Sequence, residues 1–103
     1  MQGLELNSRV TSGGELQLSL VEVAVPAPGP DQIVVRVEGT PINPSDLGLL
    51  LGPADITSAK AHGTTTTFTI PPQRMSAVQA RVDQTMKVGN EGAGTVVDAG
   101  ENA

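Results

Sequence analysis

Two short segments contain most of the residues in this sequence that could take part in chemistry. The NPSD segment (43–46) offers an amide, a hydroxyl and a carboxylate, and the glycine segment (89–94, GNEGAG) encloses another amide and another carboxylate. Such groups can hold a polar ligand, transfer a proton or coordinate a hard cation. The two segments are therefore the first candidates for a functional site.

The glycine segment does not predict a phosphate-binding loop. The dinucleotide fingerprint is G-x-G-x-x-G, placed after a strand and at the start of a helix. Here the spacing is G-x-x-G-x-G, and a predicted helix precedes the glycines while a predicted strand follows them. We interpret these glycines as a tight passage of the chain from helix to strand.

The sequence does not predict a zinc site. Catalytic zinc takes three side-chain ligands from Cys, His, Asp and Glu, but the chain has no cysteine and His62 is its only histidine. We interpret His62 as a solvated loop residue. Asp46 and Glu91 together would suit at best a weak site for an oxygen-preferring cation. We therefore expect no metal.

Composition argues against several classes of function. The net charge is −5, and the six basic residues are scattered, which is unfavourable for binding nucleic acid or an anionic membrane. No apolar run approaches the roughly 20 residues of a membrane span. Residues 1–10 lack the hydrophobic region of a signal peptide. We expect a cytoplasmic protein.

Strands are expected to position both segments. Alternating side chains on either side of Gly13-Gly14 predict a β-hairpin over residues 4–20. Residues 33–39 and 93–100 are rich in β-branched side chains and predict two further strands. Residues 64–70, TTTTFTI, predict a strand at an exposed edge that could recruit a second subunit, and the preceding residues from 53 onward are expected to form a loop.

Two helices are expected between the strands. Asn43 suits an N-cap and Pro44 a first helical position, which predicts a short helix near 44–51. An amphipathic helix is predicted near 72–88, with Gly89 ending it. Its apolar side chains stand at helical spacing: Met75, Val78, Val82 and Met86.

The whole chain, 1–103, is expected to form one mainly β (α+β) domain, a curved sheet or partly open barrel with two helical insertions. Phe68 is the only aromatic residue, and no disulfide can form. Because ordering the backbone costs about 1–2 kcal/mol per residue, we expect a marginally stable domain that depends on a neighbour. Such a domain could serve as a non-enzymatic interaction or oligomerisation module.

The order of these segments also resembles a known family. The predicted hairpin, the strand that leads into TPINPSDLGLLLG (40–52), and VGNEGAGTVVDAG (88–100) are together similar to the amino-terminal GroES-like catalytic domain of medium-chain dehydrogenases/reductases. That family includes alcohol dehydrogenases and quinone reductases. The resemblance covers nearly the whole chain, is weakest over 53–75, and implies a GroES-like partly open β-barrel.

The resemblance implies the zinc-free branch of that family. Zinc-dependent members carry G-x-x-C-x-[ST]-D and then G-H-E-x-x-G. In this chain Asn43 stands at the cysteine position and Asn90 at the histidine position, while Ser45, Asp46 and Glu91 match. The chain thus resembles NADPH:quinone oxidoreductase-like proteins, and Asn90 and Glu91 would be structural residues at a lost zinc site.

The reaction implied by the resemblance is hydride transfer from NADPH or NADH to a quinone, enone or aldehyde. Asn43 and Pro44 would lie on the nicotinamide side of the cofactor, and Ser45 would match a hydroxyl that relays protons. Asp46 is a third catalytic candidate. The alternative is purely structural, because capping explains Asn43 and Ser45 and a buried hydrogen-bonded role would explain Asp46.

Family members continue into a Rossmann domain that binds the cofactor, and this sequence holds no such βαβ pattern with its glycine fingerprint. We therefore expect a fragment or an orphan domain that has no dinucleotide bound and is inactive alone. Its expected partners are a Rossmann domain or further copies of itself in a homo-oligomer, together with a small-molecule substrate.

Overall fold

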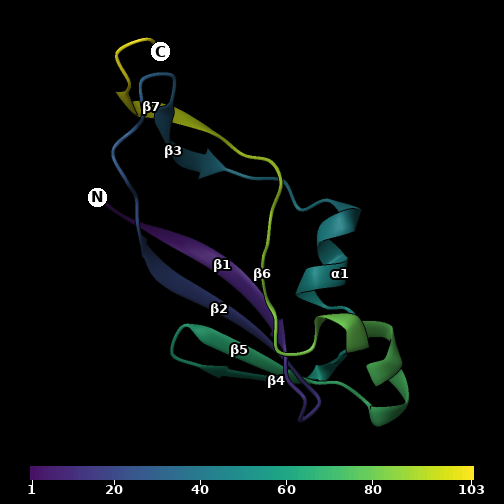
Figure 1. The fold of residues 1–103 in the computed structure, drawn as a ribbon. Coiled ribbons are helices and arrows are strands. Elements are labelled where there is room, and N and C mark those ends of the chain that lie inside the picture. Colours follow the sequence, from purple (N-terminus) through teal and green to yellow (C-terminus); the bar gives the residue numbers. More distant parts are fainter.

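The computed structural model describes residues 1–103 and arranges them as two antiparallel sheets with short helical segments between them (Figure 1). The larger sheet has the strand order β4-β5-β2-β1-β6, and the smaller sheet pairs only β3 with β7. The strands are β1 (Gln2–Val10), β2 (Glu15–Ala24), β3 (Ile33–Gly39), β4 (Asp55–His62), β5 (Thr65–Thr69), β6 (Thr85–Lys87) and β7 (Ala93–Ala99). The helical segments are η1 (Pro44–Asp46), α1 (Leu47–Leu50) and η2 (Pro72–Arg81). The predicted mainly β fold is confirmed, and the sheets stay open without closing into a barrel.

The hairpin of β1 and β2 forms as the alternating side chains predict. Val10 pairs with Leu16 next to the turn, and the two strands stay in register to their far end. Gly14 in the turn has a φ of +85°, a conformation that glycine adopts readily because it lacks a Cβ. Strands over 33–39 and 93–99 are likewise confirmed, and they pair with each other.

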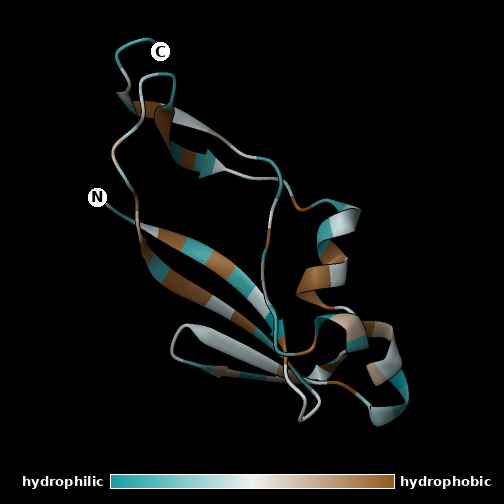
Figure 2. Cartoon of the chain, viewed as in Figure 1, coloured by the Kyte–Doolittle hydropathy of each residue, from teal (hydrophilic) through white to brown (hydrophobic).

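The hydrophobic core is small and lies where β1, β2 and β5 meet η2. It consists of six buried residues: Val10, Leu16, Ala54, Phe68, Ile70 and Val78. The radius of gyration is 16.4 Å, whereas a compact domain of this length has about 13 Å. Figure 2 shows apolar segments along β1, β2, β3 and β7, and β3 and β7 contribute no residue to this core. The chain is thus elongated and leaves much apolar surface exposed.

The short first helix is confirmed as η1 followed by α1, but the prediction of a second helix over 72–88 is wrong in its second half. The segment η2 is a 3-10 helix that ends at Arg81, and Thr85–Lys87 forms β6 on the edge of β1. The helical conformation ends at Val82, whose ψ of 133° is extended, and Asp83 follows with a φ of 60° in the left-handed region. A spacing of four residues places side chains on one face of a strand as well as a helix, so Val82 and Met86 do not discriminate between them. None of the helical segments has the length and apolar character needed to cross a lipid bilayer.

The segment that the sequence predicts as a loop forms β4 instead. As a result, the predicted position of TTTTFTI at an edge of the sheet is also wrong. β4 pairs with β5 from Lys60 to His62, and an irregularity separates this part from Asp55. β4 pairs with one side of β5, and β2 pairs with the other side. β5 is therefore not the edge strand that its sequence predicts. β4 has few β-branched residues, so its local propensity for a strand is weak.

Hydrogen bonds inside the irregular part of β4 hold the Asp55 carboxylate. The Thr57 hydroxyl donates to Oδ1 of Asp55 over 2.6 Å and the Thr57 N–H over 3.0 Å, and these bonds lower the pKa of Asp55 below its ordinary value. Because the folded pKa is the lower one, the stability gained from this carboxylate is present above the unfolded pKa and is lost as pH falls through the folded pKa.

Replacing Thr57 by valine should therefore raise the pKa of Asp55 toward its usual value, because valine keeps the shape and removes the hydroxyl. Thr57→Ser keeps the hydroxyl and should retain the low pKa. Carbon-13 NMR titration of the Asp55 carboxyl group measures both. An unchanged pKa in Thr57→Val would contradict the assignment.

Candidate functional site

The structure brings the NPSD segment and the start of the glycine segment together at one end of the smaller sheet. Antiparallel pairing places Gly39, the last residue of β3, opposite Ala93, the first residue of β7. The chain leaving β3 and the chain entering β7 therefore run side by side (Figure 1). The Asn43 Nδ2 group donates to Oε1 of Glu91 over 3.2 Å, and the Thr40 hydroxyl donates to the Glu91 carbonyl. These two bonds join the segments.

The start of η1 is fixed by a buried carboxylate. Asn43 occupies the N-cap position with extended backbone, and Pro44 is the first residue of η1. Asp46 is 4% exposed, and its Oδ2 accepts the Asn43 N–H over 2.8 Å, while its own N–H donates to the Asn43 carbonyl over 2.9 Å. This arrangement favours the structural role of Asp46 over a catalytic one, because the carboxylate already serves the turn.

The other predicted site residues lie at the surface. Ser45, Asn90 and Glu91 are exposed, and Asn43 is half-buried. The residue that bonds to Asn43 is Glu91, one position after Asn90. Beyond that bond, the Asn43 amide has a second N–H, so it can donate to a ligand.

His62 lies outside this site. It is the exposed last residue of β4, in the larger sheet, and it precedes Gly63 with a φ of +62°. The prediction that it is solvated is confirmed, although it belongs to a strand and not to a loop. No three of the His, Asp and Glu side chains come together in an arrangement that could hold a metal ion.

Ser8 and Arg81 form a polar contact that the sequence analysis missed. Ser8 is fully buried in β1, and its hydroxyl donates to the Leu49 carbonyl over 2.5 Å. Arg81 donates to the Ser8 hydroxyl over 3.2 Å and to the Gly48 carbonyl over 3.3 Å, and burial lowers the pKa of its guanidinium. The contact holds α1 against β1, and η1 directly precedes α1. It therefore positions Asn43 indirectly.

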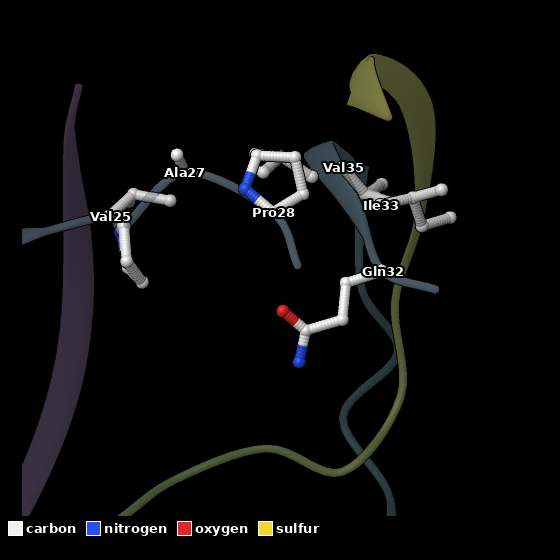
Figure 3. Close-up of a pocket in the computed structure, with 8 residues that line it drawn as sticks. Val25, Ala27, Pro28, Gln32, Ile33 and Val35 are labelled. Carbon is white, nitrogen blue, oxygen red and sulfur yellow. The ribbon is translucent and has the colours of Figure 1, made fainter. Parts of the chain in front are cut away.

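Two hollows lie away from Asn43 and Glu91. The larger one has a volume of about 680 Å³ and opens between the two sheets, lined mainly by apolar side chains of β1, β2, β3 and β7. The smaller one, of about 420 Å³, lies along the connection from β2 to β3. Figure 3 shows Val25, Pro28 and Gln32 around it. The Gln32 Oε1 atom accepts the Gly29 N–H over 2.8 Å, so this side chain closes a turn.

Comparison of the sequence with family models and with curated proteins gave no match. Assignment of a function therefore depends on the residues and geometry of the chain itself.

Proposed function

We propose that this chain is the catalytic-domain portion of a zinc-independent, NAD(P)H-dependent quinone or enone oxidoreductase of GroES-like topology, inactive by itself. The observation that supports this proposal is the hydrogen bond between Asn43 and Glu91. The resemblance to medium-chain dehydrogenases/reductases depends on two segments that meet at one site in that family. The same two segments are joined here, although they lie far apart in the sequence.

The surroundings of Asn43 fit the carboxamide end of a nicotinamide better than its phosphates. The second N–H of the Asn43 amide can donate to the carbonyl oxygen of a carboxamide. No lysine or arginine lies within 40–46 or 89–92, so phosphate groups would need cations from another domain. When bound, the cofactor supplies the hydride. Asn43 would orient the ring, and the exposed Ser45 hydroxyl would hold a proton for the substrate oxygen, whose developing charge needs hydrogen-bond donors.

Reduced nicotinamide mononucleotide is the probe that tests this proposal. We expect weak binding, with NMR shift changes confined to residues 40–46 and 89–92. Asn43→Ala should weaken binding about tenfold, because it removes hydrogen bonds worth roughly 1–1.5 kcal/mol. The exposed Asn102, replaced by alanine, is the matched control and should leave binding unchanged. Absence of shifts at these segments, or shifts that Asn43→Ala does not reduce, would overturn the proposed role.

A second candidate, an interaction or oligomerisation module without catalysis, is favoured by the apolar surface of the smaller sheet. Five of its side chains are 39–61% exposed: Ile33, Val35, Val37, Val96 and Val97. Clustered apolar exposure of this kind is typical of surfaces that bind another polypeptide. If the nicotinamide titration fails while the chain associates, this second function is the better description.

A further inference from the structure

The smaller sheet has an unpaired edge on each side. β3 pairs with no strand other than β7, and the backbone hydrogen bonds outside the named elements involve none of residues 33–39. A two-stranded sheet alone is marginally stable in water, and stability needs three or more strands or a covered face. The free N–H and C=O groups of an exposed edge accept another strand. Figure 1 shows β3 and β7 lying apart from the larger sheet.

The side chains of β3 separate into an apolar face and a charged face. Ile33, Val35 and Val37 alternate along one face, whereas Val34, Arg36 and Glu38 lie on the other, and the pairing with β7 is irregular after Val34 and at Glu38. The Arg36 Nη2 atom is 3.6 Å from Oε1 of Glu38, and both side chains are more than half-exposed. The strand therefore carries two opposite charges two residues apart, at an open edge.

We propose that β3 pairs antiparallel with β3 of a second copy of this chain, about a two-fold axis at Val37. Two residues directly opposite each other in an antiparallel pair project from the same face of the sheet. The apolar face therefore stays continuous only in registers that place odd-numbered residues of one copy opposite odd-numbered residues of the other. With the axis at Val37, Arg36 lies opposite Glu38 of the second copy. The symmetry of an isologous interface makes this pair occur twice.

The neighbouring registers lack this complementarity. An axis at Arg36 would place two arginines opposite each other, and like charges in that position are destabilising. An axis at Val35 would place Arg36 opposite Val34 of the second copy, without a charge partner. Only the axis at Val37 satisfies both the apolar face and the charges.

No other open edge in the structure is self-complementary in this way. β7 has one charged residue, Asp98, and pairing about Val96 would place it opposite Gly94. In β4, Asp55 and Lys60 stand at an odd and an even position, so a two-fold antiparallel pairing cannot place them opposite each other. β6 has only three residues, and residues 2–6 of β1, which extend beyond β6, have Glu5 as their only charged side chain. The edge of β3 is therefore the surface where a second copy fits.

Sedimentation equilibrium on the 103-residue chain tests the pairing through two charge reversals. Wild type is expected to form dimers. Arg36→Glu puts two carboxylates opposite each other in both halves of the interface, and Glu38→Arg puts two guanidinium groups there. Each change should weaken dimerisation about tenfold or more. Lys60→Glu and Glu22→Arg, exposed positions in the larger sheet, change net charge equally and should leave dimerisation unchanged.

Mixing the Arg36→Glu chain with the Glu38→Arg chain is the decisive measurement. Each chain alone repels its own copy, whereas the mixed dimer places opposite charges together at both positions, so association should return close to the wild-type level. The ion pair within one chain cannot produce this rescue, since each variant chain holds only like charges. A wild-type monomer at all concentrations, single variants that dimerise normally, or natively folded variants that fail to associate when mixed would each overturn the proposal.

Discussion

Replacing Leu16 by alanine is expected to reduce the free energy of unfolding by about 2–5 kcal/mol, the usual cost of truncating a fully buried leucine. Leu16 is completely buried at the centre of a core of only six residues. Small domains have about 5–15 kcal/mol of stability in total, and so small a core places this chain toward the lower limit. Leu16→Ala should therefore unfold a large fraction of the chains. Urea denaturation followed by far-ultraviolet circular dichroism measures the loss.

Leu20→Ala is the matched control, because it makes the same substitution on the same face of the same strand. Leu20 is 45% exposed, and surface substitutions usually change stability by less than about 0.5 kcal/mol. If Leu16→Ala and Leu20→Ala destabilised equally, the core would not lie at the end of the hairpin where the structure places it.

This contrast also shows how far sequence patterns predict the fold. The alternation of Leu16, Leu18 and Leu20 predicts a strand with one apolar face, and that strand forms. Alternation does not tell how much of the face is covered. Burial decreases from Leu16 to Leu20 because η2 and β5 pack against only one end of β2. Local patterns specify the strand, whereas its burial depends on distant segments.

The candidate site could be predicted in part. Asn43, Pro44 and Asp46 have local signals, because helix starts favour these residue types, and the structure places them at the start of η1. The bond between Asn43 and Glu91 depends on the pairing of β3 with β7, and the residue types alone do not specify that pairing. The resemblance, not composition or spacing, suggested that the two segments share a site.

The sequence contains only weak evidence for the contact between Ser8 and Arg81. Ser8 is a polar residue on the same inward face of β1 as Val10. A buried polar residue of this kind needs a hydrogen-bond partner. The partner cannot be identified from sequence, because the sequence pattern predicts a longer helix that includes Arg81. The end of η2 at Arg81 is followed by the extended backbone of Val82, the left-handed Asp83 and the pairing of Thr85–Lys87 with β1.

Gly94→Ala is expected to separate β7 from β3 while the larger sheet stays folded. A Cβ on Gly94 would overlap the Arg36 carbonyl oxygen and lie 2.9 Å from the Val37 Cα. These are backbone atoms, so no side chain can move aside and the strands themselves must part. Hydrogen exchange measured by NMR should show loss of amide protection in β3 and β7, with protection in β1 and β2 unchanged.

Gly39→Ala provides the control within the same sheet, because a Cβ on Gly39 would meet no atom within 4 Å. Protection in β3 and β7 should survive that change. Gly94→Ala should also abolish both the nicotinamide-dependent shifts and the dimer, since the pairing of β3 with β7 positions Asn43 beside Glu91 and presents the charged edge. Loss of protection throughout the chain in Gly94→Ala would instead mean that the two sheets unfold as one cooperative unit, although few contacts join them.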